Sequence, residues 1–235
     1  MLSRVNDGDG TNAGRGAKIS MTYFRPAYYA IRFLADRHLK RLCKSRRAIV
    51  LTYDDGPGAR LSQSLSKLLL AHDARGTFFL LGRRVVMDTD TVELLARDGH
   101  ELGCHSYDHL HAWKTSASRA VADINAGYDA VSRWVNPGGL FRPPHGKLSY
   151  ATWRALRRRG ARTCWWTLDS GDTWPVLPTP QSVVDSVLHS GGGVVLMHDF
   201  DRGPDREKYV LNTTEALLAA AERERQERQA ERDAP

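Results

Sequence analysis

Short apolar runs alternate with segments of helical periodicity from residue 48 onward, and this alternation constrains the fold most strongly. The expected strands span 48–53, 77–81, 100–104, 140–142, 161–168 and 193–197. The expected helices span 62–71, 91–98, 118–135, 151–159, 181–189 and 212–225. Continuously apolar strands that alternate with helices are typical of a parallel sheet covered by helices. About six such units predict an α/β fold, a distorted or incomplete (β/α) barrel with parallel strands and outer helices.

Composition divides the chain into four expected parts: a disordered arm at 1–20, a basic amphipathic helix at 21–47, the main domain at 48–222 and a charged tail at 223–235. The amphipathic helix is expected to begin at Pro26, and Tyr28, Ala35 and Leu39 share its apolar stripe. Two interpretations of this helix stay open. It either packs on the barrel or makes a peripheral contact with an anionic membrane.

The net charge of +7 is concentrated at the N-terminus. Residues 1–47 hold 11 Lys and Arg against 3 Asp and Glu, which leaves the remainder close to neutral. A nucleic-acid-binding domain would carry a basic face within its folded body, so we expect no nucleic-acid partner. The three cysteines have no metal-type spacing, and the N-terminus lacks the apolar segment of a signal peptide. We therefore expect a cytoplasmic protein, either free or peripheral to the inner face of the membrane.

Reactive side chains follow the expected strands at the points where they end. Asp54 and Asp55 follow the first strand, and two adjacent carboxylates repel each other unless a positive charge lies beside them. Other strand ends carry further such residues: His105, His109, Arg142, Asp169, Asp172 and His198. The carboxyl ends of parallel strands meet at one edge, where catalytic residues of such folds lie. The pattern therefore predicts one shared site.

A metal ion would relieve the repulsion between the two carboxylates. His105 and His109 are four residues apart, which on a helical turn places both imidazoles on one face. Two imidazoles and Asp55 would leave coordination positions open, as in a catalytic zinc site. His111 is a competing partner close by.

Taken singly, most of these residues have an ordinary structural interpretation. His198 fits a core histidine, and Arg142 fits a surface ion pair. Asp169 and Asp172 fit turn caps, because aspartate is common in turns. Reactive residues at five of the six expected strand ends favour a functional site instead.

The chain resembles the NodB-type polysaccharide deacetylases, carbohydrate esterase family 4. The resemblance is carried by TYDDGP at 52–57, HSYDH at 105–109, RPPHG at 142–146, LDSGDTW at 168–174 and LMH at 196–198. These blocks occur in the family's order and cover roughly 48–222. The resemblance implies the fold expected above and an enzyme that removes N-acetyl groups from amino sugars in poly- or oligosaccharides.

Roles for individual residues are implied by the same resemblance. Asp54 is similar to the family's general base and His198 to its general acid, supported by Arg142 and Asp172. Asp55, His105 and His109 are similar to the ligands of a divalent metal, usually zinc, with cobalt or another divalent ion as alternatives. The implied substrate-binding residues are Pro144, His145, Trp166, Trp174 and Leu196, with the His145 backbone N–H as the oxyanion donor.

The chain departs from the family pattern at three places. Tyr53 stands where phenylalanine is usual, and His145 often corresponds to an aromatic residue. Thr173 separates Asp172 from Trp174, where the family has an adjacent Asp-Trp pair. This insertion leaves open whether Asp169 or Asp172 supports His198.

The expected function is metal-dependent hydrolysis of an N-acetyl amide on an amino sugar. One alternative keeps the centre and changes the substrate, to a formyl or acetyl group on a lipid-linked amino sugar at the cytoplasmic membrane. Another is a carbohydrate-binding module without turnover, which the six tryptophans would suit. Intact acid, base and ligand positions argue against this second alternative.

Overall fold

The computed structural model describes residues 12–233, with side chains described from residue 26 onward. Its strands form one seven-stranded sheet of order β5-β4-β3-β2-β1-β7-β6. The strands are β1 (Ile49–Gly56), β2 (Thr77–Leu80), β3 (Glu101–Cys104), β4 (Leu140–Phe141), β5 (Arg162–Thr163), β6 (Leu168–Asp169) and β7 (Gly193–His198). All the pairings described between them are parallel. The expected parallel α/β architecture is therefore confirmed.

The sheet curls into an incomplete barrel because its two edge strands are close in sequence. Only residues 164–167 separate β5 from β6, and so short a segment spans at most about 18 Å. The amide of Cys164 still bonds to the carbonyl of Phe141 beside β5, at 2.8 Å. The amide of Thr167 already bonds to the carbonyl of Val194 on β7, at 2.9 Å. We call residues 164–167 the bridging segment.

The single strand expected at 161–168 is therefore wrong. Its apolar sequence is typical of a strand, but its two ends pair with strands at opposite edges of the sheet. Trp165 and Trp166 lie in the bridging segment between them. Strand pairing is a contact between distant parts of the chain, which local apolar character does not encode.

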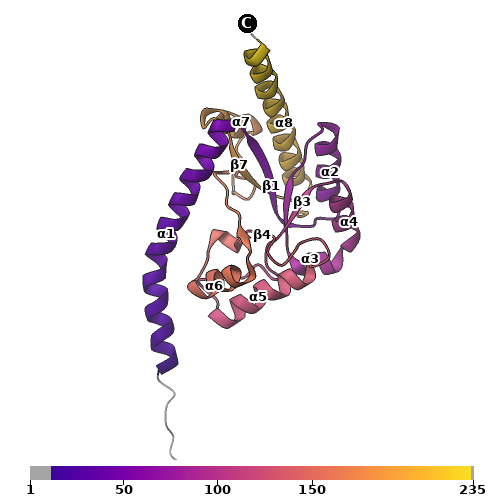
Figure 1. Cartoon of the computed structure of the whole chain (residues 1–235). Helices are drawn as coiled ribbons and strands as arrows, with labels where there is room; N and C mark the ends of the chain where they lie inside the picture. The colour runs from indigo at the N-terminus through magenta and orange to yellow at the C-terminus, as the bar shows by residue number, and fades with distance from the viewer. Residues whose placement is uncertain (1–11, 234–235) are drawn as a thin grey trace, which may run out of the picture.

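Helices cover the outside of the curled sheet, as Figure 1 shows. They are α1 (Asn12–Arg46), α2 (Leu61–Ala71), α3 (Gly82–Met87), α4 (Thr89–Arg97), α5 (Ala117–Ala130), α6 (Tyr150–Arg159), α7 (Pro180–His189) and α8 (Pro204–Asp233). A short 3₁₀ turn, η1, spans Pro144–Gly146. Helix α3 is an addition to the expected elements. Helix α8 begins eight residues earlier than expected and includes most of the charged tail.

Helix α1 lies along one side of the barrel (Figure 1), so the packed interpretation of the basic helix matches the structure. Tyr28 and Cys43 on its inner face are buried. The helix begins at Asn12, so residues 12–20 are helical where disorder was expected. The packed part of α1 that follows is already helical, so residues 12–20 only extend it. Extending a helix costs less free energy than nucleating one. The remainder of the expected arm, residues 1–11, lies outside the described residues.

Successive side chains of β1 point alternately toward the core under the helices and toward the barrel interior. Tyr53 stacks on Phe78 at 4.8 Å between ring centroids, and its hydroxyl lies 3.1 Å from Oγ1 of Thr214 on α8. Thr52 and Asp54 point to the other face, because neighbouring residues of a strand face opposite sides. Both bond to a buried arginine there. The pattern of β1 therefore carries one carboxylate into the interior.

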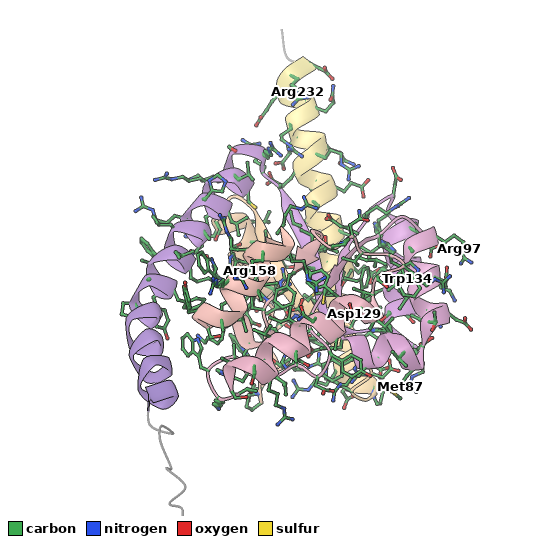
Figure 2. All side chains as sticks on the ribbon, turned by 60° about the horizontal axis from the view of Figure 1, so that its bottom comes forward. Met87, Arg97, Asp129, Trp134, Arg158 and Arg232 are labelled. Carbon is green, nitrogen blue, oxygen red and sulfur yellow. The ribbon has the colours of Figure 1, made fainter. Side chains whose placement is uncertain are left out.

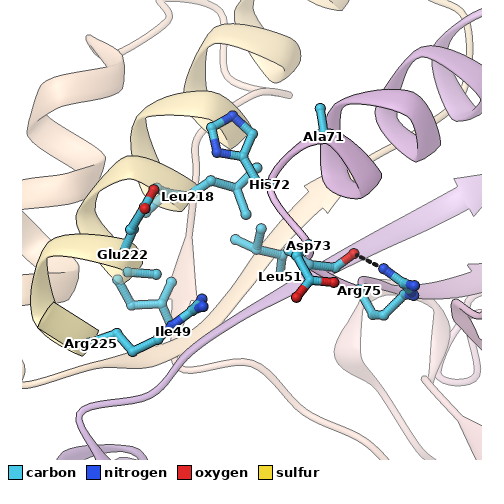
Figure 3. Close-up of a pocket in the computed structure, with 12 residues that line it drawn as sticks. Ile49, Leu51, Ala71, His72, Asp73, Arg75, Leu218, Glu222 and Arg225 are labelled. Carbon is cyan, nitrogen blue, oxygen red and sulfur yellow. Dashed lines mark hydrogen bonds between the residues drawn. The ribbon is translucent and has the colours of Figure 1, made fainter. Parts of the chain in front are cut away.

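Side chains crowd the space that the ribbon encloses (Figure 2). Met87 and Arg232 extend from the periphery in the same view. A hollow of about 360 Å³ lies between α2 and α8, and Leu51, His72 and Glu222 are among its lining residues (Figure 3). This hollow faces the start of β1, at the opposite end of that strand from Asp54. Across the residues that the structure describes, no helix combines the length and apolar character needed to cross a membrane.

Two adjacent leucines of α2 test the assignment of the core. Leu69 is 0% exposed and Leu70 is 37% exposed. We expect Leu69→Ala to lower the free energy of unfolding by about 2–5 kcal/mol, because it leaves a cavity. Leu70→Ala is the matched control and should cost well under half as much. Urea denaturation measures both, and equal losses would contradict the described orientation of α2.

Candidate active site

The residues predicted to share a site do gather at the carboxyl ends of the strands. Asp54 on β1 and His198 on β7 are direct partners in the parallel register. Residues in register on adjacent strands project to the same face, so both side chains lie on one side of the sheet. His105 follows β3 and Arg142 follows β4 at the same edge.

Asp54 is held by a buried arginine. The two residues are 3% and 0% exposed, and Nη1 of Arg142 donates to Oδ1 of Asp54 at 2.8 Å. The same Nη1 donates to Oγ1 of Thr52, also at 2.8 Å, and the guanidinium lies over the Phe79 ring at 4.2 Å. The surface ion pair considered for Arg142 is therefore wrong. The contacts fix the position of the Asp54 carboxylate.

Asp55, His105 and His109 form a group that could hold a metal ion. One ligand atom from each lies within 4.8 Å of the others. Oδ1 of Asp55 lies 3.5 Å from Nε2 of His105 and 3.4 Å from Nε2 of His109. His111 is not a member of this group; its ring stacks on the His145 ring at 4.8 Å.

The loop that presents the two histidines is not the expected helical turn. Ser106 and His109 have φ of 68° and 61°, so the backbone is left-handed at both positions. The loop folds around Asp123, whose carboxylate accepts from the amides of Asp108 at 2.7 Å and Leu110 at 3.4 Å. These bonds fix the loop, where the sequence spacing suggested a helix.

The environment of the three residues fits a cation. Oδ1 of Asp55 is buried and has no hydrogen-bond partner among the described residues. Nδ1 of His105 bonds to the Arg142 carbonyl at 2.7 Å, which directs Nε2 toward Asp55. Burial raises the pKa of Asp55, but His105 and His109 hold it below its usual range. Burial and the neighbouring His105 lower the pKa of His109, which keeps its imidazole neutral and able to bind a metal.

His198 is a charged histidine at neutral pH. Its Nδ1 lies 3.0 Å from Oδ1 of Asp172, and its backbone amide donates to Oδ2 at 2.9 Å. Burial lowers the pKa of His198, but the bond to Asp172 and the nearby carboxylates raise it to about 9. Asp172 is fully buried, and Arg202 Nη2 donates to it at 2.7 Å. Burial raises the pKa of Asp172, but His198 and Arg202 together outweigh this effect and hold the pKa below its usual range.

The geometry decides between the two aspartates that the sequence left open. Asp172 contacts His198, as described above. Oδ1 of Asp169 instead accepts from the amide of Gly171 at 2.8 Å, within the turn that leads to Asp172. Asp169 therefore has the capping role, and Asp172 is the partner of the histidine.

The predicted substrate-binding residues lie in different settings. Pro144 is buried in η1, and Leu196 is buried on β7 two residues before His198, on the same face. His145 has φ of 54°, and its ring lies 4.4 Å from the His109 ring. Burial and His111 lower the pKa of His145.

The two tryptophans differ in their contacts. The Trp166 ring lies 5.6 Å from the guanidinium of Arg142, so it borders the interior of the site. Trp174 is 49% exposed. Within residues 26–233 no hydrogen bond or ring contact joins it to Asp54, Asp55 or His198. A place for Trp174 in the acetyl pocket finds no support in this geometry.

Asp199 is a buried acid that the sequence analysis missed. It is 0% exposed, and Oγ of Ser62 donates to its Oδ2 at 2.6 Å. Burial raises the pKa of Asp199 to about 7. Its position directly after His198 was the only signal in the sequence.

Comparison with known proteins gives consistent matches. Residues 41–164 match the sequence model of the polysaccharide deacetylases. A peptidoglycan-N-acetylglucosamine deacetylase of Bacillus cereus is 32% identical over 175 residues, which are 74% of this chain and 81% of that protein. Chitin deacetylase 2 of Saccharomyces cerevisiae is 29% identical over 163 residues, 63% of this chain and 49% of that protein.

Two solved structures share the fold. A family 4 carbohydrate esterase from Streptomyces lividans, in complex with acetate, has a TM-score of 0.65 and 25% identity. A polysaccharide deacetylase from Bacillus cereus has a TM-score of 0.63 and 26% identity. Each match covers 75% of this chain and 88% of the other. The chain belongs to the polysaccharide deacetylase family.

Proposed function

We propose that the protein hydrolyses the N-acetyl amide of an amino sugar within a poly- or oligosaccharide. The observation that carries the proposal is the pairing of Asp54 with His198 on adjacent strands, beside the group of Asp55, His105 and His109. A base, an acid and a cation site thus share one edge of the sheet. The relatives named as peptidoglycan and chitin deacetylases support an N-acetylated carbohydrate as the substrate.

Asp55, His105 and His109 would hold a divalent metal, with zinc as the first choice and cobalt as an alternative. The unpartnered Oδ1 of Asp55 and the directed Nε2 of His105 are the support for this assignment. Three protein ligands leave positions open for water and substrate, as catalytic zinc sites require. When bound, such an ion polarises a carbonyl and lowers the pKa of water toward about 7.

Asp54 would act as the general base. Arg142 fixes its Oδ1, and Oδ2 lies 3.7 Å from Nε2 of His105. The carboxylate therefore stands beside the cation site, where it can accept a proton from the attacking water. The division between adjacent residues is then simple: Asp55 binds the ion and Asp54 moves the proton.

His198 would act as the general acid. Its pKa of about 9 keeps it protonated at neutral pH, ready to give a proton to the departing nitrogen. Asp172 holds the ring through Nδ1, so Nε2 is the nitrogen that would donate. The backbone N–H of His145 is the proposed donor to the oxyanion, and Leu196 and Trp166 are the proposed walls for the acetyl methyl.

The alternatives receive no support from the structure or the comparisons. No observation favours a formyl group or a lipid-linked sugar over an acetyl group on a saccharide. The binding module without turnover does not explain a buried base and a charged acid in register. The expected absence of a nucleic-acid partner stays a prediction, as does the cytoplasmic location.

The outer face of α1 supports a contact with anionic membrane. Phe33 and Leu34 are 58% and 63% exposed there, although the apolar stripe of the helix is covered by the barrel. The exposed basic residues that follow them are Arg37, Lys40, Arg41 and Lys44. Exposed apolar side chains beside a run of cations suit the interface of an anionic bilayer. We therefore propose that this face docks peripherally on such a bilayer.

Loss of the proposed base should slow turnover strongly without removing the ion. We expect Asp54→Asn to lower kcat for acetate release from N-acetylated chito-oligosaccharides by about 10²–10⁴-fold, because proton transfer to a positioned base is lost. Chelation should abolish the activity of the unmodified protein, and zinc or cobalt should restore it. Asp185→Asn on the exposed face of α7 is the control. Full activity after complete removal of metal, or in Asp54→Asn, would refute the mechanism.

The pH dependence should report the support of His198. A general acid must be protonated, so kcat falls as pH rises through its pKa, which is about 9 here. Asp172→Asn removes the favourable carboxylate, so the fall should move to lower pH. Titration of the imidazole by NMR measures the same shift in the metal-free protein. Asp169→Asn should leave the profile in place; a shift there and none in Asp172→Asn would reverse the assignment.

Membrane contact is tested by co-sedimentation with phosphatidylcholine vesicles, with and without phosphatidylglycerol. We expect binding only to the anionic vesicles. The triple variant Arg37→Gln/Arg41→Gln/Lys44→Gln should bind on the order of 100-fold more weakly, at about 1 kcal/mol for each basic residue. The charge-matched control removes three exposed arginines of α6: Arg154, Arg157 and Arg158. Equal loss in both triple variants would show non-specific attraction.

A further inference from the structure

Helix α1 holds two side chains against the loops that carry the site. Tyr28 and Arg32 lie one helical turn apart on the inner face of the helix. Tyr28 is 4% exposed, and its hydroxyl donates to the carbonyl of Gly146. Nη2 of Arg32 donates to the carbonyl of Trp166 at 2.8 Å. The family match begins at residue 41, so both side chains belong to a part of the chain outside that match.

Ring contacts reinforce the two hydrogen bonds. The Tyr28 ring meets Trp113 edge-on at 5.5 Å and Trp165 at 6.1 Å between centroids. The Arg32 guanidinium lies 4.9 Å from the Trp165 ring and 5.4 Å from the Trp166 ring. Such aromatic and cation–π contacts add to the burial of the rings. One turn of α1 therefore contacts tryptophans from two separate loops.

The Gly146 carbonyl belongs to the turn that presents the proposed oxyanion donor. His145 has φ of 54°, a conformation that is uncommon for a residue other than glycine. Within η1 the amide of Gly146 bonds to the Pro143 carbonyl at 2.9 Å. An uncommon backbone conformation persists only where its surroundings hold it. The hydrogen bond from the Tyr28 hydroxyl to Gly146 helps to hold this conformation from outside the turn.

The Trp166 carbonyl belongs to the bridging segment that lies beside the base. Nη2 of Arg142 reaches the carbonyl of Trp165 at 3.4 Å, and its Nη1 bonds to Asp54. Arg142 and Arg32 thus bind consecutive carbonyls of one segment, the first from the barrel interior and the second from helix α1. Movement of the segment would disturb the arginine that orients Asp54.

We propose that Tyr28 and Arg32 are positioning residues, and that helix α1 clamps the η1 turn and the bridging segment over the acid–base pair. Neither side chain needs to touch substrate. The clamp acts by aligning the His145 N–H and by holding the bridging segment, whose Trp165 carbonyl accepts from Arg142. A misaligned donor loses stabilisation of the transition state, so kcat falls while KM changes little. The catalytic consequence rests on the proposed deacetylase function, whereas the ordering of the two segments does not.

The test compares Tyr28→Phe and Arg32→Gln with matched controls on the same helix. Tyr29→Phe and Arg46→Gln make the same chemical changes at exposed positions. Backbone hydrogen exchange is followed in 145–148 and 164–168 of the full chain, together with kcat and KM. We expect each clamp variant to exchange about five- to tenfold faster in the segment it holds, as loss of one buried hydrogen bond predicts. We expect kcat to fall by about the same factor, with KM within about twofold.

The outcomes distinguish a local effect of the clamp from global destabilisation and from failure of the proposed deacetylase function. Unchanged exchange in both clamp variants would overturn the proposal. Faster exchange throughout the barrel, helix α2 included, would also overturn it, because the effect would then be global destabilisation. Arg32→Lys keeps a donor and should recover part of the loss at 164–168. If the unmodified protein releases no acetate while the two segments still respond, the proposed function fails and the clamp stands.

Discussion

The ion pair between Arg142 and Asp54 is the interaction on which the rest of the site depends. Arg142 is fully buried, and an unpaired charge in that position would cost several kcal/mol. Its Nη1 bonds to both Asp54 and Thr52, and its Nη2 reaches the Trp165 carbonyl. Its own carbonyl meets Nδ1 of His105. One residue therefore links the proposed base, a metal-ligand candidate and the segment that joins the two edges of the sheet.

A kink at the end of β1 gives two adjacent carboxylates different surroundings. Neighbouring residues of a regular strand face opposite sides, which would carry Asp55 away from the site. Asp55 instead has φ of 72°, and the register with β2 is irregular between Asp54 and Gly56. A Cβ at Gly56 would lie 2.1 Å from Oδ2 of Asp199, so glycine is required beside the kink. The kink lets Asp54 meet the arginine and Asp55 meet the histidines.

The sequence predicted those features that depend on local pattern. Strand-helix alternation predicts the fold class, and parallel strands bring their carboxyl ends together, so the convergence of Asp54, His105 and His198 followed from topology. The split of 161–168 was missed because pairing with β4 and β7 is not a local property. The loop fold at His105–His109 depends on Asp123, which is distant in sequence. The contacts of Tyr28 with the site loops likewise exist only once α1 has packed.

The two histidine environments show how one residue type can serve opposite roles in a single site. His109 is partly buried beside a second imidazole, and its pKa is lowered. His198 is also partly buried, but Asp172 binds its ring and its pKa rises to about 9. A neutral imidazole suits a metal ligand, and a charged imidazole suits an acid. Arg202, in a loop beyond β7 that the motif LMH does not include, donates in turn to Asp172 and so helps to hold the proposed acid. The group that contacts each imidazole therefore determines whether the ring suits metal binding or proton donation. The presence of a histidine alone does not determine this.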